Sequence, residues 1–441
     1  MATPSGGAIG IVRVSGPEAI SIADSLFSGN LSEAKAATLH YGQFYNDQGS
    51  LLDDVVIGLW RAPHSYTGED CVEISCHGSA YILGQVLQAL INKGCRHAGP
   101  GEYTMRAYLN GKMDLSQAEA VADLVASNNR ASQQAAISQI KGHFSSVLSI
   151  LREQLLKMTS LLELELDFSD HEELEFADRG ELKQLAKTID KKLTELIDSY
   201  ATGQALREGV SVAIVGATNV GKSTLLNQLL QDDKAIVSPV AGTTRDVIDG
   251  TTVIHGVTFR FVDTAGIRKT NDQIEQLGIE RTFSQLQKAK VVLYVTDNGK
   301  LAPDFKEVEE NVKDKPLIII ENKTDLRPAS LKNEAHPVIA ISAKKGYGIA
   351  ELREKIFESA GIREVNETSV IVTNARHYGA LLSAKKSIAN VLQALSAQIS
   401  ADLIAEDLHQ CSDELANITG VDRITPTETL SSIFSHFCVG K

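Results

Sequence analysis

VSVAIVGATNVGKSTLLNQLL, residues 210–230, carries the strongest structural signal in this chain. The apolar run 210–215 predicts a buried strand, and residues 224–230 predict the start of a helix. Between them, GATNVGKS (216–223) matches a glycine-rich loop that cradles phosphate groups. In such a unit, backbone N–H groups and a helix N-terminus point at the same place. The stretch therefore predicts a phosphate-binding strand–loop–helix unit rather than an ordinary glycine turn.

Three residues of this loop have separate predicted roles. Gly221 lets the backbone approach a phosphate closely, Lys222 contacts the β- and γ-phosphates, and the Ser223 hydroxyl binds magnesium. We also expect their neighbours to line the nucleotide, namely Asn219, Val220 and Thr224.

Four more short motifs follow the loop in order. They are AGTTRD (241–246) before a strand-like segment at 250–254, DTAG (263–266) after a predicted strand at 258–262, NKTD (322–325) after the apolar run 317–320, and SAK (342–344). Each motif alone is a weak signal. All five in this order within one domain length predict a guanine-nucleotide-binding domain that hydrolyses GTP.

The second and third motifs predict the side of the site that binds the metal and the γ-phosphate. Thr244 and Thr243 are placed to close over the metal and sense the γ-phosphate, as switch segments do. Asp263 can hold magnesium through water, so Lys222, Thr244 and Asp263 are candidate catalytic residues. We predict nucleotide contacts here from Ser238, Pro239, Val240, Ala241, Gly242, Thr243, Thr244, Asp263, Thr264, Ala265 and Gly266.

NKTD predicts the identity of the base. The Asp325 carboxylate can accept from the two N–H donors on one edge of guanine, whereas adenine would leave it unpaired. Asn322 is expected to fix the loop, and the Lys323 stem can lie on the purine face. The other side of the base is closed by Ser342, Ala343 and Lys344.

The residue after DTAG departs from the pattern of Ras-like GTPases, in which a glutamine there orients the attacking water. Ile267 occupies that position, and its side chain can neither donate nor accept a hydrogen bond. Another group must therefore position the water. Glu275 is a candidate, although from the residues alone a solvated helix face is the simpler interpretation.

Length and composition bound the remaining possibilities. A chain of 441 residues with 43% hydrophobic and 22% charged residues predicts about three globular domains. We find no secretory signal and no apolar run long enough to span a membrane. Five cysteines, an odd number in a long chain, favour a reducing cytoplasm over a disulfide scaffold. The net charge of −13 argues against general coating of nucleic acid.

The pattern along the chain predicts a multidomain protein that combines α/β and all-α parts. Strands are expected over 8–14, 55–60 and 71–76, with a helix over 79–92; apolar residues recur at helical spacing over 118–125, 140–155, 182–196 and 381–408. Helices on both sides of the nucleotide domain suggest that it is inserted into a helical domain. The predicted ranges are 1–112 (N-terminal α/β), 113–205 (helical, first part), 206–362 (GTPase, Ras-like α/β) and 363–441 (helical, second part).

Further stretches resemble one family, the tRNA-modification GTPases called MnmE or TrmE, over nearly the whole chain. They are ATPSGGAIGIVRVSG (2–16), YTGEDCVEISCHG (66–78), PGEYTMRAYLNGKMDLSQAEAVADL (100–124) and the terminal FCVGK (437–441). The resemblance implies a cytoplasmic homodimer that acts on tRNA with an FAD-dependent partner, MnmG or GidA. Together they would install an aminomethyl or carboxymethylaminomethyl group at carbon 5 of the wobble uridine.

The resemblance also implies two sets of ligands. A tetrahydrofolate derivative, the one-carbon donor, would bind the N-terminal domain through Arg13, Glu73, Lys112 and Lys441. Arginine and lysine side chains suit the folate carboxylates, and Glu73 could accept from the pterin N–H edge. Potassium would promote pairing of two GTPase domains through Asn219, Ser238, Val240 and Thr243, and the water-orienting glutamate of the family falls on Glu275.

Two other functions remain open from the sequence. A ribosome-assembly GTPase would usually carry an RNA-binding module after the nucleotide domain, where this chain has helices and FCVGK. A self-assembling GTPase of the dynamin or septin type would accommodate the long helices, but the sequence has no membrane-binding signal. Stable folate binding would argue against both.

Overall fold

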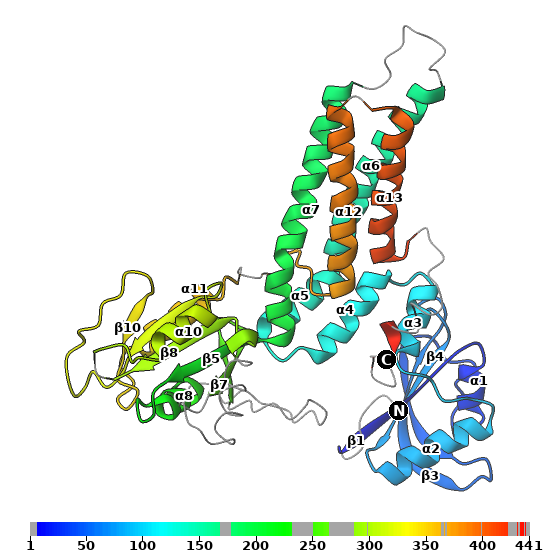
Figure 1. Ribbon diagram of the computed structural model, residues 1–441. Helices are drawn as coiled ribbons and strands as arrows, with labels where there is room; N and C mark the ends of the chain where they lie inside the picture. Colours follow the sequence, from blue (N-terminus) through cyan, green and yellow to red (C-terminus); the bar gives the residue numbers. More distant parts are fainter. Residues whose placement is uncertain are drawn as a thin grey trace, which may run out of the picture. The chain divides into compact units, whose positions relative to one another are not determined.

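The computed structural model describes residues 7–167, 178–231, 250–263, 286–297, 299–362, 366, 368–397, 399–421, 430, 433–435 and 437 (Figure 1). The chain divides into two compact units. One comprises residues 1–125, 139–189 and 386–441, and the other comprises residues 126–138 and 190–385. Each unit is therefore assembled from segments that are far apart in the sequence.

The first unit begins with a four-stranded antiparallel sheet of order β1-β4-β3-β2. Its strands are β1 (Ile9–Ser15), β2 (Thr38–Tyr45), β3 (Leu51–Trp60) and β4 (Cys71–His77). Helices α1 (Ala19–Asp24) and α2 (Ala80–Asn92) bury one face of this sheet. The strands predicted at 8–14, 55–60 and 71–76 are confirmed, whereas β2 was not predicted, because its apolar residues Leu39 and Tyr41 lie on the exposed face and blur the alternation.

Helices follow the sheet. They are α3 (Glu102–Leu109), α4 (Leu115–Ala126), α5 (Arg130–Ile140), α6 (His143–Asp167), α7 (Arg179–Glu208), α12 (Ala375–Ser396) and α13 (Ala401–Thr419). In the first unit, α13 lies along α6, and both figures show the start of α7 and the end of α12 beside them. Between residues 113 and 178 the sequence predicted two helices, over 118–125 and 140–155, but the described part of that range contains three, α4, α5 and α6. Gly142, with φ of 81°, ends α5 in the left-handed region before α6 begins.

The second unit contains a six-stranded sheet of order β10-β9-β8-β5-β7-β6, parallel except for the β6–β7 pair. Its strands are β5 (Val210–Gly216), β6 (Gly250–Ile254), β7 (Val257–Asp263), β8 (Val291–Thr296), β9 (Leu317–Glu321) and β10 (Val338–Ala340). This is the Ras-like α/β arrangement that the sequence predicts, and the fold class is confirmed.

Both faces of this sheet are covered by helices. One face packs against α8 (Lys222–Gln231) and α11 (Ile349–Ser359), and the other packs against α10 (Phe305–Asn311). All six residues of β8 and all five of β9 are buried. A parallel strand buried on both faces has to be apolar throughout, which is why these strands appear as continuous apolar runs in the sequence.

Two negative observations apply to the described ranges. None of their helices is both long enough and apolar enough to cross a membrane. The cysteines among them, Cys71, Cys76, Cys95 and Cys411, are all free thiols.

A pair of glycines in the second unit tests how closely α7 packs. A Cβ on Gly203 would lie 2.0 Å from the carbonyl oxygen of Val372, whereas a Cβ on Gly379 would meet nothing within 4 Å. We expect Gly203→Ala to lower the free energy of unfolding by about 2 kcal/mol, because backbone must move to admit the methyl group. Gly379→Ala should raise it by roughly 0.5–1 kcal/mol, because alanine favours the helix.

Calorimetric unfolding of the full-length chain measures both variants against the wild type. Equal effects of the two substitutions would contradict the close contact between α7 and Val372.

Candidate functional site

The motif residues of the second unit meet at one edge of its sheet. β5, β8, β9 and β10 run parallel, so their carboxyl ends lie together. The phosphate loop follows β5, NKTD follows β9 and SAK follows β10. In open α/β sheets, ligands bind at this edge.

The phosphate loop requires glycine at two positions. A Cβ on Gly216 would lie 2.2 Å from the carbonyl oxygen of Val295, and a Cβ on Gly221 would lie 2.4 Å from Nδ2 of Asn322. Both glycines also have positive φ, 144° and 98°. The loop then enters α8, so the helix N-terminus faces the same space. This geometry fits a phosphate group.

Lys222 is buried at the start of α8, where its ammonium group lies inside the loop. Its Nζ donates to the carbonyl oxygens of Gly216 at 2.8 Å and Ala217 at 2.9 Å. Ser223 and Thr224 occupy the next positions of the first turn and are exposed. The loop residues predicted from the sequence therefore lie on one backbone segment that folds around the Lys222 ammonium group.

The side chain of Asn322 joins three motifs. Its Nδ2 donates to the carbonyl oxygen of Val220 at 2.8 Å, and its Oδ1 accepts from the backbone N–H of Ala343 at 2.9 Å. Asn322 is only 4% exposed, so both hydrogen bonds are shielded from water. These two hydrogen bonds join the phosphate loop, NKTD and SAK, while the contact of Asn322 with the base stays a prediction.

Asp325 lies at the rim beside the SAK motif. The Ser342 hydroxyl donates to its Oδ1 at 2.6 Å. This hydrogen bond is the main reason that the pKa of Asp325 lies below its ordinary value, with further contributions from the positive charges of Lys344 and Lys345. The carboxylate is thus kept ionised and oriented, as an acceptor for the two guanine N–H donors must be.

The structure also shows a residue that the sequence analysis missed. Asp297, directly after β8, makes a 2.7 Å ion pair with the Nζ of Lys323, which also donates to the carbonyl oxygen of Asn219 at 2.8 Å. The sequence did contain a signal for this residue. Asp297 is a polar residue directly after β8, the strand that lies next to β9, which leads into NKTD.

Several predicted residues lie outside the described ranges, and their predicted roles remain predictions. They are Ser238, Pro239, Val240, Ala241, Gly242, Thr243, Thr244, Thr264, Ala265, Gly266, Ile267, Glu275 and Lys441, together with the side chain of Asp263.

The first unit carries the other predicted site. Arg13 and Glu73 are opposite each other in the β1–β4 register, and Nε of Arg13 donates to Oε1 of Glu73 at 2.7 Å. The guanidinium of Arg13 also lies over the rings of Tyr66 and Tyr103, 6.0 Å and 5.5 Å from their centroids. These two tyrosines were not among the predicted residues.

Lys112 is held nearby by a different contact. Its Nζ donates to the carbonyl oxygen of Pro63 at 2.8 Å. A Cβ added to Gly68, two residues after Tyr66, would lie within 3.5 Å of the Lys112 side chain. The segment 63–68 therefore connects Lys112 with the Arg13 cluster.

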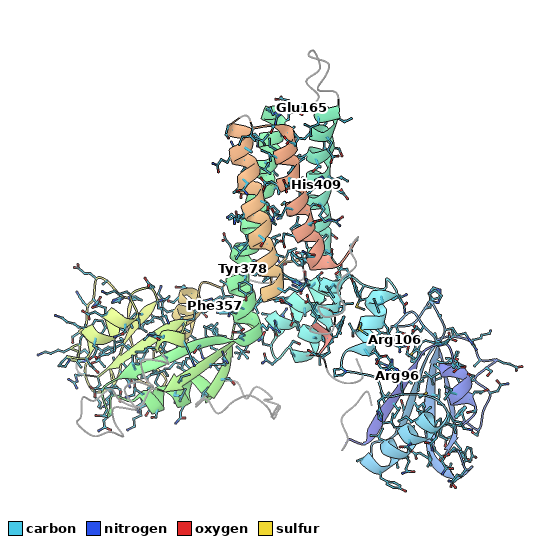
Figure 2. All side chains as sticks on the ribbon, turned by 45° about the vertical axis from the view of Figure 1, so that its right-hand side comes forward. Arg96, Arg106, Glu165, Phe357, Tyr378 and His409 are labelled. Carbon is cyan, nitrogen blue, oxygen red and sulfur yellow. The ribbon has the colours of Figure 1, made fainter. Side chains whose placement is uncertain are left out.

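An arginine–glutamate network supports this cluster. Glu102, at the start of α3, accepts from Arg96 at 2.5 Å and from Arg106 at 2.8 Å, and Arg106 also bonds Glu69 at 2.9 Å. Figure 2 labels Arg106, which belongs to this helix, and Arg96, which precedes it. Arg96, Glu102 and Arg106 line a cavity of about 230 Å³ together with Arg13 and Tyr103. On the same helix, the Tyr103 hydroxyl donates to the carbonyl oxygen of Arg13 at 2.7 Å, which joins α3 to the strand that carries Arg13.

The second unit's topology, its phosphate loop and its base-reading motifs define a P-loop GTPase domain. Family models match the rest of the chain: the GTP-binding protein TrmE N-terminus over residues 1–112 and the MnmE helical domain over 115–438. The chain belongs to the MnmE family of tRNA modification GTPases.

Full-length relatives agree with this family. A tRNA modification GTPase MnmE from Phocaeicola vulgatus is 48% identical over 489 residues, covering 100% of this chain and 98% of the relative. That of Bacteroides thetaiotaomicron is 50% identical over 461 residues, with the same two coverages. Among solved structures, Aquifex aeolicus Era bound to GDP.AlF4- is 29% identical over 40% of this chain, with a TM-score of 0.27.

The charge network around Glu102 predicts a pH dependence. Glu102 is 11% exposed, and hydrogen bonds, first of all from Arg96, lower its pKa from 4.5 to about 2. Because the folded state binds its proton more weakly than the unfolded state, this contribution to stability is complete above pH 4.5. It is lost as the pH falls from 4.5 towards about 2.

We expect Glu102→Gln to lower the free energy of unfolding at pH 7 by on the order of 2 kcal/mol, and the difference from wild type to shrink below pH 4.5. Denaturant titrations at several pH values measure this difference. Glu163→Gln is the matched control, because Glu163 is 53% exposed beside His409 and its charge should contribute less than about 0.5 kcal/mol. A difference for Glu102→Gln that stays constant with pH would contradict the assignment.

Proposed function

We propose that this chain hydrolyses GTP as one component of an enzyme that modifies tRNA. With an FAD-dependent partner of the MnmG (GidA) type, it installs an aminomethyl or carboxymethylaminomethyl group at carbon 5 of the wobble uridine. A tetrahydrofolate derivative supplies the carbon. The observation that supports the proposal is that one chain of the MnmE family holds both the Ser342–Asp325 hydrogen bond in the NKTD region and the Arg13–Glu73 pair.

The residues of the phosphate loop suit GTP hydrolysis. Lys222 and the N-terminus of α8 would stabilise negative charge on the phosphates, and Ser223 with Thr244 would hold magnesium. Asp263, at the end of β7, would bind the metal through water. Glu275 would orient the attacking water, since Ile267 cannot.

Potassium would complete the charge stabilisation when two GTPase domains pair across their nucleotide faces. Its proposed ligands are Asn219, Ser238, Val240 and Thr243. Asn219 fits this role, because it lies exposed in the phosphate loop with its backbone held in the left-handed region, at φ of 65°. A cation there would act where an arginine finger acts in other GTPases.

The folate derivative would lie against the Arg13 cluster. Arg13, Lys112 and Lys441 would bind its carboxylates, and Glu73 would accept from the pterin N–H groups. The rings of Tyr66 and Tyr103 beside Arg13 suit a flat aromatic ligand. We also propose that the protein is a cytoplasmic homodimer.

Replacement of potassium by sodium tests the activation mechanism. We expect GTP turnover at equal ionic strength to fall at least about tenfold, because the catalytic positive charge is lost. Turnover per chain in potassium should also rise with protein concentration, because the domains must pair. Turnover that is indifferent to the cation would remove potassium from the mechanism while leaving GTP hydrolysis in place.

Asp325→Asn tests whether tRNA modification depends on recognition of the guanine base by this chain. In a reaction reconstituted with the FAD-dependent partner, tRNA, the folate donor and GTP, wobble-uridine modification should fall by at least about 100-fold, because the amide presents a donor to a guanine donor. Xanthosine triphosphate should restore it, since xanthine has a carbonyl oxygen at that position. Mass spectrometry of the wobble nucleoside measures the product.

Asp314→Asn is the matched control, because Asp314 is an exposed aspartate of the same unit outside the motifs. It should keep the preference for GTP. Modification by Asp325→Asn that is unchanged with GTP would contradict the role of the nucleotide site in the tRNA reaction.

A further inference from the structure

Two strained residues face each other across the nucleotide site. Among the described non-glycine residues only Ala37, Asn219, His255 and Lys323 have positive φ. Asn219 (65°) belongs to the phosphate loop and Lys323 (63°) to NKTD. Each left-handed residue costs on the order of 1 kcal/mol, and such strain persists only where the surroundings hold it.

One side chain connects these two residues. The Nζ of Lys323 donates to the carbonyl oxygen of Asn219 at 2.8 Å. A lysine has a flexible four-carbon stem and a point charge, so a single carbonyl acceptor fixes it poorly. The second anchor is the Asp297 carboxylate, whose Oδ2 lies 2.7 Å from Nζ.

The sheet fixes the position of this second anchor. Asp297 directly follows β8, which lies between β5 and β9 in the sheet. β5 leads into the phosphate loop and β9 leads into NKTD. A carboxylate at the carboxyl end of the middle strand therefore sits between the two loops, on a strand whose residues are all buried.

The pair is also shielded more than a typical surface ion pair. The side chains of Lys323 and Asp297 are 34% and 25% exposed. Freely exposed pairs contribute little to stability, whereas charge-assisted hydrogen bonds that lose much of their hydration are stronger.

We propose that Asp297 is a positioning residue of the nucleotide site. It holds the Lys323 ammonium group, and through it the backbone of Asn219, so that the phosphate loop and the base-reading loop keep one geometry before nucleotide binds. Asp297 thereby sets how tightly the chain retains guanine nucleotides. The inference rests on the proposed function only in that guanine nucleotide is the ligand.

Equilibrium binding of a fluorescent GDP analogue to the full-length chain tests the proposal. We expect Asp297→Ala to weaken binding about tenfold, because the ammonium group loses its anchor and the loop its preorganisation. Asp297→Asn keeps the size and an acceptor but not the charge, so its loss should be smaller, about threefold.

A double-mutant cycle gives the readout that a merely structural role would not produce. If Asp297 acts through Lys323, Asp297→Ala should cost nothing further in a chain that already carries Lys323→Ala. Glu358→Ala is the matched control, because Glu358 makes a 2.9 Å ion pair with Lys355 on α11, outside the motifs. It should leave the affinity unchanged.

The outcomes separate this inference from the proposed function. Wild-type affinity in Asp297→Ala, or a loss that adds fully to that of Lys323→Ala, overturns the inference and leaves GTP binding intact. A wild-type chain that binds no guanine nucleotide overturns both. If Asp297→Ala fails to fold, the affinity of Asp297→Asn for the GDP analogue tests the inference, and a wild-type affinity overturns it.

Discussion

The nucleotide site depends on one buried amide. The side chain of Asn322 donates to the carbonyl oxygen of Val220 and accepts from the N–H of Ala343, so it holds the phosphate loop, NKTD and SAK in one arrangement. A buried polar group that loses its hydrogen-bond partner lowers the stability by about 1–3 kcal/mol, so other arrangements of the three loops are disfavoured. Gly221 has to be glycine for the same reason, because a Cβ there would collide with this amide.

The two candidate sites of the chain are built on different kinds of sheet, one antiparallel and one mostly parallel. In the second unit, parallel strands bring the ends of β5, β8, β9 and β10 to one edge, so loops distant in sequence lie together where such sheets bind ligands. In the first unit, the antiparallel register places Arg13 directly opposite Glu73, where the rings of Tyr66 and Tyr103 lie beside the guanidinium group. The first arrangement suits recognition by loops, and the second suits recognition by side chains on a rigid surface.

Much of the fold was readable from the sequence because its signals are local. Residues 210–230 specify their own strand, loop and helix, and the buried strands β8 and β9 are apolar throughout. The strand β2 was missed because half of it faces solvent, and the break between α5 and α6 was missed because it depends on one glycine. Such elements form because of the residues that they pack against. The spacing of apolar residues along the sequence does not show those contacts.

The sequence alone was sufficient for the identity of the motifs, because phosphate and guanine impose residue types at fixed spacing along the chain. It also marked Arg13 and Glu73, through the family resemblance. The partners that orient these residues came from tertiary structure: Asp297 beside Lys323, Ser342 on Asp325, and the tyrosines over Arg13. These contacts join strands and loops that are far apart in sequence. Spacing along the chain therefore cannot reveal them, and the sheet order brings them within hydrogen-bonding distance.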